Sequence, residues 1–328
     1  MPARVVCLSP FDEATVRGMF EGRHQVEIVL VPAPPAQLEV AAACVDADLV
    51  IADRRHRHRI DRTVLEVMRR CKLIQQPAVG FDTIDYRAAA EFGIPVANAA
   101  GYNKDSVADW TVMAMIALIR RSFWGDRQLR AGRWSDEDQM RAEEMMGREL
   151  GAMTIGIVGL GNVGSAVARR LAGFGSRILF ADIVSRTLAG TTQVGLDSLL
   201  SESDIVCVHT PLDVDTRRLI NAERLATMQR GSYLVNAARG AIVDEAALVE
   251  ALRSGLLAGA ALDVFDVEPL PTDSPLRTLE NVILAPHRGA ATREAETRLI
   301  EVVGENLRRV LDGRPPLNVV NLVQERAR

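Results

Sequence analysis

Long apolar runs are missing from this sequence, because none reaches the ~20 residues that a helix needs to span a bilayer. The first ten residues, MPARVVCLSP, lack the apolar segment and cleavage site of a signal peptide and are instead typical of a first β-strand. Cysteine is scarce, and its four copies are scattered without a C-x-x-C pair, at Cys7, Cys44, Cys71 and Cys207. We therefore expect small buried thiols, no metal site and a soluble protein of a reducing compartment, most simply the cytoplasm.

An excess of basic charge is also missing. The net charge is −4 and the isoelectric point is near 5.8, which argues against nucleic acid as a partner. What is present is an ordinary globular balance, with 48% hydrophobic and 25% charged residues. A length of 328 residues exceeds one typical core and predicts about two domains.

Short β-branched runs alternate with longer helical patterns, which predicts βαβ units and parallel sheets. Before residue 100 we expect strands in 4–8, 25–30, 48–52, 72–76 and 94–98. The alternation restarts after residue 151, with strands expected in 153–159, 176–182, 204–210, 231–238, 259–265 and 281–286. Six strands in the second half match the count of a dinucleotide-binding sheet.

Three segments lie outside this alternation. Residues 106–121 are predicted to form an apolar helix that ends in two arginines, as helix C-termini prefer. Residues 125–150 are polar and charged, and we interpret them as a solvated surface segment between units. Residues 293–313 are predicted to form a helix that is followed by an extended tail, 314–321.

A glycine-rich loop, GIVGLGNVG, follows the apolar run TIGIV and opens a helical pattern. Gly159 permits a tight turn, Gly161 lets the backbone approach a pyrophosphate at the helix N-terminus, and Gly164 lets helix and strand pack closely. Asp182 ends the next predicted strand, where a carboxylate can accept hydrogen bonds from both ribose hydroxyls and repels a 2′-phosphate. NAD is therefore favoured over NADP, although Arg186, four residues on, keeps NADP as an alternative.

The motifs SVADW, GIVGLGNVG, HTPL, NAARGAIVDEAALVEAL, AALDVFDVEPL and APHRGAAT occur in one order, preceded by VGFDTID and GIPVAN. In these motifs the chain resembles the D-isomer-specific 2-hydroxyacid dehydrogenases over nearly its whole length. The resemblance implies an α/β fold with two domains and an active site in the cleft, usually in a homodimer. A flavodoxin-like substrate domain would comprise 1–101 and 291–328, and a Rossmann NAD-binding domain would comprise 102–290.

The resemblance implies a catalytic set of three residues. His287 corresponds to the general acid/base, which gives a proton to a 2-keto acid as hydride arrives from the nicotinamide, or removes the hydroxyl proton in oxidation. Glu268 corresponds to the carboxylate partner of that histidine. Arg239, in a turn after a strand, corresponds to the arginine that binds the substrate carboxylate and carbonyl oxygen. The substrate would be a small anionic 2-keto or D-2-hydroxy acid.

Further contacts follow from the same resemblance. The amides of Val79 and Gly80, in PAVGFD, are expected to hold the substrate carboxylate. Asp263 corresponds to an aspartate near the nicotinamide, although a carboxylate satisfied by backbone amides is an equal alternative. The other expected cofactor contacts are loop residues, namely Asn162, Val163, Thr210, Pro211 and Ala237.

Four positions depart from the family pattern. Asp109 stands where most members have glutamate, and Trp110 where histidine is common. Pro77 precedes the carboxylate loop and stiffens it. Arg288 replaces the small or apolar residue that usually follows the catalytic histidine, which would place an extra cation beside the substrate.

The basic run RRHRHR, residues 54–59, follows the third expected strand. One interpretation is a solvated loop. The other is a docking site for a second anionic group of the substrate, a phosphate or carboxylate, with Arg55 near a family arginine.

Two alternatives remain on the same scaffold. Dimeric NAD-sensing corepressors keep a similar triad, so turnover must distinguish them from an enzyme. Formate dehydrogenase has glutamine at the position of Glu268, which disfavours it.

Overall fold

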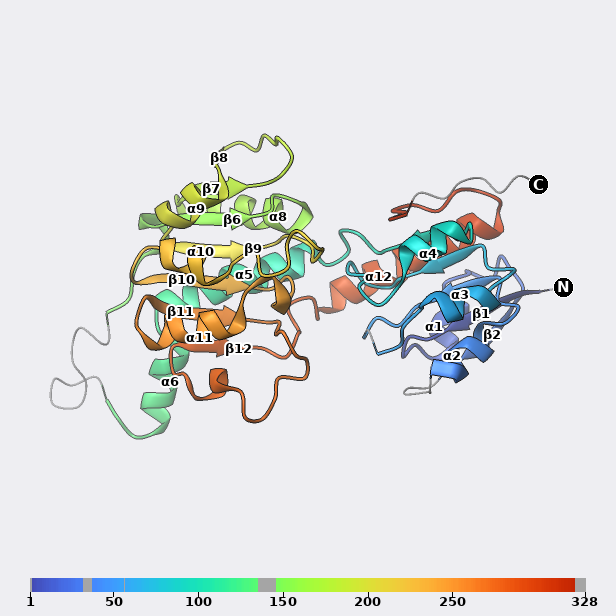
Figure 1. Ribbon diagram of the computed structural model, residues 1–328, viewed down its shortest axis with the longest axis horizontal. Helices are drawn as coiled ribbons and strands as arrows, with labels where there is room; N and C mark the ends of the chain where they lie inside the picture. Colours follow the sequence, from blue (N-terminus) through green and yellow to red (C-terminus); the bar gives the residue numbers. More distant parts are fainter. Residues whose placement is uncertain (1, 32–36, 56, 135–145, 322–328) are drawn as a thin grey trace. The chain divides into compact units, whose positions relative to one another are not determined.

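The computed structural model describes residues 2–31, 37–55, 57–134 and 146–321. The chain divides into two compact units, one of 1–103 with 292–328 and one of 104–291 (Figure 1). Each unit is built on its own parallel sheet. No helix in the described ranges is long and apolar enough to cross a membrane.

The first unit holds, in its described residues, a five-stranded sheet in the order β2-β1-β3-β4-β5. This is the flavodoxin-like order, with every pairing parallel. The strands follow the predicted runs: β1 (Ala3–Cys7), β2 (Val26–Leu30), β3 (Leu49–Ile51), β4 (Leu73–Gln75) and β5 (Val96–Ala97). The helices of this unit are α1 (Glu13–Gly18), α2 (Gln37–Cys44), α3 (Arg62–Val67), α4 (Tyr86–Glu91) and α12 (Arg293–Leu311).

Both faces of this sheet are buried, because its strands contribute to two separate apolar clusters. Val6, Val50 and Ile74 pack in a cluster with residues of α2, α3 and α4. The other cluster joins neighbouring strand positions to α1 and α12. Burial on both faces explains why these strands are continuous apolar runs in the sequence.

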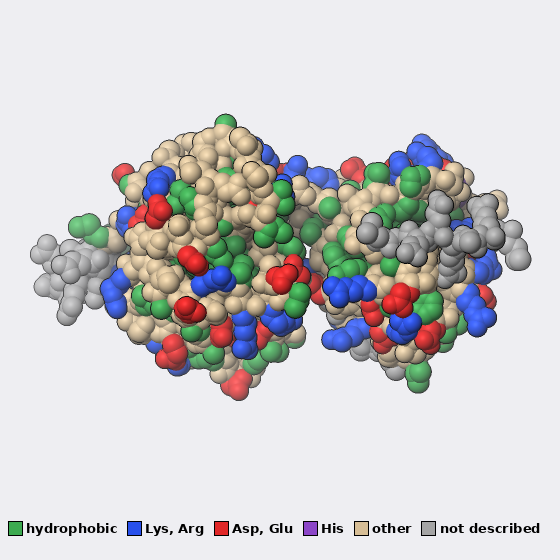
Figure 2. Space-filling model, turned by 45° about the horizontal axis from the view of Figure 1, so that its top comes forward, with side chains coloured by type: hydrophobic (Ala, Val, Ile, Leu, Met, Phe, Trp, Pro, Cys, Tyr) green, Lys and Arg blue, Asp and Glu red, His purple; other side chains and the backbone are tan. Residues whose placement is uncertain are grey.

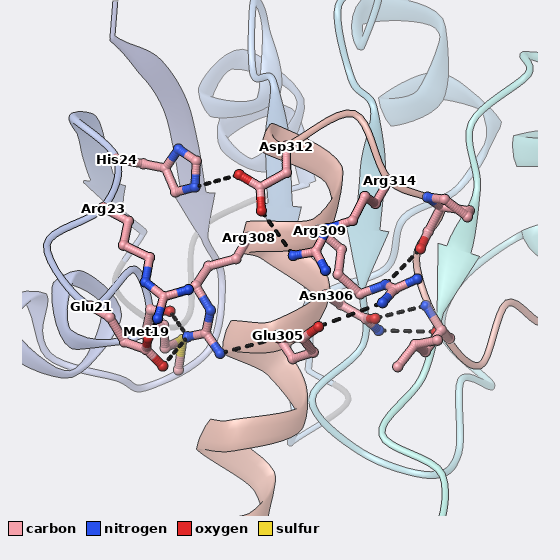
Figure 3. Close-up of polar contacts among 12 residues, drawn as sticks. Met19, Glu21, Arg23, His24, Glu305, Asn306, Arg308, Arg309, Asp312 and Arg314 are labelled. Atoms are coloured by element: carbon pink, nitrogen blue, oxygen red, sulfur yellow. Dashed lines mark hydrogen bonds and ion pairs between the residues drawn. The ribbon is translucent and has the colours of Figure 1, made fainter.

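Helix α12 returns the end of the chain to the first unit through apolar and polar contacts. Leu299, Val303 and Leu307 are fully buried, and buried Asn306 donates to Gln75 Oε1 at 2.7 Å. Figure 3 shows the far end of the helix, where Arg308 bonds the carbonyl of Met19 and Asp312 meets His24. These contacts fix α12 as part of this unit.

The second unit contains, within its described part, a seven-stranded sheet in the order β12-β11-β10-β9-β6-β7-β8. Its first six strands in the chain follow the Rossmann order, which runs 3-2-1-4-5-6. The strands are β6 (Thr154–Val158), β7 (Arg177–Ala181), β8 (Thr191–Gln193), β9 (Ile205–Val208), β10 (Ser232–Asn236), β11 (Leu257–Leu262) and β12 (Val282–Leu284). The expected count of six was wrong, because β8 is a short polar strand, TTQ, at the sheet edge.

Helices cover both faces of this sheet and enclose two apolar clusters. They are α5 (Lys104–Ile119), α6 (Ser122–Arg130), α8 (Asn162–Leu171), α9 (Leu196–Glu202), α10 (Ala222–Thr227) and α11 (Glu245–Arg253). Side chains alternate between the clusters, since Ile155 and Ile157 of β6 pack in one and Val158 in the other.

The polar stretch 125–150 differs from its interpretation as a segment between units. It lies inside the second unit, and its first residues belong to α6, with Leu129 and Phe123 exposed. Residues 135–145 are outside the described part of the chain.

Candidate active site

The glycine-rich loop connects β6 to α8 in a conformation that depends on its glycines. Gly159 has φ of 92°, and a Cβ there would lie 3.0 Å from the backbone of His209 and Thr210. A Cβ on Gly164 would collide with the carbonyl oxygen of Gly159. Gly161, by contrast, has nothing within 4 Å of such an atom. It precedes the first turn of α8, which has no side-chain cap, so the amides of Asn162 and Val163 start a helix with open space before it.

Asp182 follows β7 and ties the glycine loop in place. Its Oδ2 accepts the amide of Leu160 at 2.9 Å and Nε of Arg186 at 3.0 Å, and its Oδ1 accepts the amide of Val184. Partial burial raises the pKa of this carboxyl, but the two amides and Arg186 outweigh it, and the pKa lies below its usual value. An anionic Asp182 beside an open helix N-terminus fits a dinucleotide with a free ribose, and Arg186 already engages that carboxylate.

The end of β9 borders the same loop. Thr210 is half-buried and Pro211 is exposed, and the Pro211 carbonyl accepts the hydroxyl of Thr216 at 2.7 Å. The preceding residue, His209, has a buried Nε2. Burial lowers its pKa to about 4, so the imidazole is neutral at physiological pH.

His287 and Glu268 form a close pair at the end of β12. His287 Nδ1 lies 2.6 Å from Glu268 Oε2, and the other carboxylate oxygen accepts the amide of Phe265 at 3.0 Å. Partial burial alone would raise the Glu268 pKa. The hydrogen bond and charge of His287, the Phe265 amide and the charge of Arg239 overcome that effect and hold the pKa below its ordinary value. The imidazole is 44% exposed, so its other nitrogen can reach a ligand.

Asp263 shapes the backbone that carries His287. The carboxylate accepts the amides of Arg288 and Gly289 at 2.7 Å each, and the Asp263 carbonyl accepts the amide of His287. His287 has φ of 52°, a left-handed conformation that this set of bonds maintains. Burial raises the pKa of Asp263, although the two amides and His287 oppose it. Backbone amides thus satisfy this aspartate in the structure, and its place near the nicotinamide stays a prediction.

Arg239 lies in the turn after β10, and buried Asn236 shapes that turn. Asn236 accepts the amide of Ala238 at 3.0 Å and donates to the carbonyl of Arg239 at 2.9 Å. A Cβ on Gly240 would collide with the Phe265 carbonyl, so the turn packs directly on the segment that leads to Glu268. Ala237 in the same turn is half-buried. The structure thus brings Arg239, Glu268, Asp263 and His287 together.

Val79 and Gly80 belong to the first unit, in the loop after β4. The Val79 carbonyl accepts Nδ2 of Asn98 at 2.7 Å, and Pro77 is buried at the start of the loop. The amides of Val79 and Gly80 have no hydrogen-bond partner among the described residues. Two free amides on one short loop can bind a carboxylate.

Carboxylates engage most of the basic run 54–59. Arg54 makes a two-pronged ion pair with Glu296, and Asp53 meets Arg57 Nε and His58 Nδ1 at 3.2 and 3.0 Å. The side chain of Arg55 is exposed. His56, part of the proposed docking site, is outside the described residues. A freely solvated loop therefore does not describe Arg54 or buried His58.

Three residues of the second unit depart from the family pattern, and the structure shows the surroundings of each. Asp109 bonds Nε of Arg170 at 2.6 Å, which joins α5 to α8. Trp110 is half-buried and borders Gly289. The side chain of Arg288 is exposed, and only its backbone contributes to the Asp263 contacts.

Residues 112–289 match the family described as D-isomer specific 2-hydroxyacid dehydrogenase, NAD binding domain. A glyoxylate reductase of Korarchaeum cryptofilum is 39% identical over 315 residues, which cover 94% of each chain. A D-3-phosphoglycerate dehydrogenase of Archaeoglobus fulgidus is 39% identical over 272 residues, 82% of this chain and 50% of the relative. The solved structure of the TT0316 protein from Thermus thermophilus superposes with a TM-score of 0.86 at 38% identity, covering 97% of this chain and 99% of that chain.

The family match lies on the second unit, and the relatives extend the likeness to the first. The predicted family and the NAD cofactor are confirmed. The chain belongs to the D-isomer-specific 2-hydroxyacid dehydrogenase family and is an NAD-dependent oxidoreductase of 2-keto and 2-hydroxy acids.

Proposed function

We propose that the chain reduces a small 2-keto acid to its D-2-hydroxy acid, with His287 as the proton donor. The pair formed by His287 and Glu268 carries this proposal. Because Nδ1 is committed to the carboxylate, Nε2 is left to give a proton to the carbonyl oxygen, or to take one from the hydroxyl in the reverse reaction. Bound NADH would supply the hydride.

The other roles follow from charge and placement. The Arg239 guanidinium would bind the substrate carboxylate and carbonyl oxygen. Its charge also lowers the pKa of Glu268, after the larger effects of His287 and the Phe265 amide. The free amides of Val79 and Gly80 would hold the carboxylate from the first unit. We assign 1–101 with 291–328 as the substrate domain and 102–290 as the NAD-binding domain. Asp263 would act as a positioning residue for His287 because it binds the amides that follow it.

The cofactor site would use the open N-terminus of α8 for the pyrophosphate, with Asn162, Val163 and Gly161 closest to it. Asp182 would accept the ribose hydroxyls, which favours NAD over NADP. Thr210, Pro211 and Ala237 are proposed as further contacts. Arg55 and Arg288 are exposed cations and would attract anionic substrates without a fixed geometry.

We further propose a homodimer in the cytoplasm. Side chains of α6 and the residues after it leave apolar surface exposed, with Phe123 at 47%, Leu129 at 58% and Trp134 at 64%. The cysteines Cys7, Cys44, Cys71 and Cys207 are free and buried, as expected from the sequence, which suits a reducing compartment. Light scattering of the purified chain measures the oligomer, and a monomer at micromolar concentration would refute the dimer.

The function is tested by NADH oxidation against glyoxylate, hydroxypyruvate, pyruvate, 2-ketobutyrate, oxaloacetate and phosphohydroxypyruvate, with NADPH in parallel. We expect turnover of at least one 2-keto acid and a preference for NADH. Tight NADH binding without turnover of any acid would contradict an enzyme and favour an NAD sensor.

A further inference from the structure

We propose that Glu296 makes the first unit select substrates with a single negative charge, because it occupies Arg54. A cation that could hold a second carboxylate or a phosphate is thereby neutralised by the chain itself. This inference rests on the proposed function and names its substrate class, a monoanionic 2-keto acid.

Arg54 lies at the carboxyl ends of the strands, where we propose that the substrate binds. Strands β3 and β4 are parallel neighbours with Ile51 opposite Gln75. The loops that follow them therefore begin side by side, at the carboxyl end of the sheet. The amide of Ala52 donates to the Gln75 carbonyl at 2.9 Å, which keeps the two loops adjacent. One loop leads to Arg54 and the other to the free amides of Val79 and Gly80.

Both terminal nitrogens of the Arg54 guanidinium are engaged by one carboxylate. Its Nη1 and Nη2 bind Glu296 Oε1 and Oε2 at 2.6 and 2.7 Å, the fork geometry that a substrate carboxylate or phosphate would otherwise use. The guanidinium carbon also lies 5.4 Å from the centre of the Phe11 ring. The backbone is fixed as well, because the Arg54 amide donates to Ser9 Oγ at 2.9 Å.

Glu296 comes from the first turn of α12, which other contacts hold in the first unit. The helix therefore places this carboxylate next to Arg54, where the two side chains are 29% and 42% exposed. A second anionic group would have to displace it from both nitrogens and would then lie near its negative charge. Such an arrangement rejects one class of ligand by repulsion rather than by shape.

Asp53 pairs with a second arginine of the run and so adds to the selection against a second anionic group. It is buried and binds Arg57 through Nε and the backbone amide. Arg55 and Arg59 are exposed cations of the run, and neither side chain pairs with an acid in the described part of the chain. A solvated cation of this kind gives a weak, strongly screened attraction.

The test compares equilibrium binding of glycolate, a monoanion, and tartronate, a dianion, to the protein–NADH complex by calorimetry. Glu296→Gln keeps the size of the side chain and removes its charge. We expect the tartronate affinity of this variant, relative to glycolate, to rise roughly tenfold. Glu294→Gln, in the same turn and exposed, is the matched control and should leave the ratio unchanged.

The double variant Arg54→Ala with Glu296→Gln identifies the cation. In this double variant the rise in tartronate affinity relative to glycolate should disappear, because no guanidinium remains at position 54 to hold the second anionic group. A gain that persists, equal changes for both ligands, or no measurable binding of either ligand would overturn the inference. Thermal unfolding of each variant shows whether it is folded.

Binding and turnover separate the two proposals. A shifted ratio without turnover of any keto acid would refute the enzyme and keep the charge selection. Turnover of glyoxylate with an unchanged ratio of tartronate to glycolate affinity would support the enzyme and refute the charge selection.

Discussion

His287 Nδ1 lies 2.6 Å from Glu268 Oε2, and the histidine that makes this contact has a left-handed backbone, with φ of 52°. The Glu268 carboxylate thus holds the ring of this residue, the Asp263 carbonyl accepts its amide, and the Asp263 carboxylate accepts the two amides that follow it. The two carboxyls have opposite pKa shifts, because the bonds and charges around Glu268 outweigh its burial and those around Asp263 do not. Their effects on stability must therefore depend on pH in opposite directions.

Glu268→Gln should cost stability at neutral pH and little in acid. The folded pKa of Glu268 is lowered from 4.5, so its contribution is present above that value and is lost as pH falls through the folded pKa. The side chain is 35% exposed, which limits the effect to about 1 kcal/mol or less. Urea unfolding from about pH 3 to pH 7 measures the difference from the wild type. A difference that grows on acidification would contradict this assignment.

Asp263→Asn should show the opposite trend. The folded pKa of Asp263 is raised from 3.8, so its contribution is present below that value and is lost as pH rises through the folded pKa. The stability of the variant relative to the wild type should therefore increase with pH. Its kcat should fall roughly tenfold or more, because one amide oxygen cannot bind both amides that follow His287.

The exposed Asp266 offers a control for this experiment. Asp266→Asn should change neither kcat nor the pH trend. A relative stability of Asp263→Asn that falls with pH would show that the carboxyl is not held as described.

Alanine substitutions of two glycines in the loop should have contrasting effects. Gly164→Ala places a Cβ against the Gly159 carbonyl and should destabilise the protein by about 1–3 kcal/mol, since overpacking moves the backbone. Gly161→Ala meets nothing in the protein, so unfolding should be unchanged while the Kd for NADH rises. Thermal unfolding and NADH fluorescence measure the two effects. Equal losses of stability would contradict the distinction.

Asp182→Ser tests the preference for NAD. Removal of the carboxylate frees Arg186 and removes the repulsion of a 2′-phosphate, so the ratio of kcat/KM for NADPH over NADH should rise at least tenfold. Asp197→Asn is the control, because Asp197 also pairs with an arginine, Arg224, but is 79% exposed. An unchanged ratio in Asp182→Ser would mean that other residues select the cofactor.

Local signals in the sequence predict those parts of the fold that depend on neighbouring residues. The strand, glycine turn and helix of 153–171 follow one another in the chain, and buried parallel strands are continuous apolar runs. β8 was missed because Thr191–Gln193 is polar and pairs along one side only. Helix α6 was missed because its residues from Gly125 onward are mostly polar and indicate a solvated segment rather than a helix.

Contacts between distant residues could not be predicted in this way. Glu296 lies 242 residues from Arg54, and no pattern around either residue indicates the other. The roles of Asn236 and Asp53 also depend on loops whose course only the fold fixes. Charge alone therefore left two interpretations of 54–59, a solvated loop and an anion site, whereas the structure shows that acids of the chain already pair with Arg54 and Arg57.

The most direct test of the account is the single-turnover rate of NADH oxidation by His287→Asn with the best 2-keto acid of the panel. The matched control is His24→Asn, because His24 also meets a carboxylate, Asp312, at 3.2 Å (Figure 3) but belongs to the first unit, whereas His287 and the glycine loop belong to the second. We expect His287→Asn to lose roughly 10²–10⁴-fold in rate with NADH binding retained, and His24→Asn to keep the wild-type rate. Acidic and basic side chains are interspersed on the surface shown in Figure 2, so a charged group by itself does not identify the proton donor. A His287→Asn enzyme within a few-fold of the wild-type rate would contradict His287 as the proton donor.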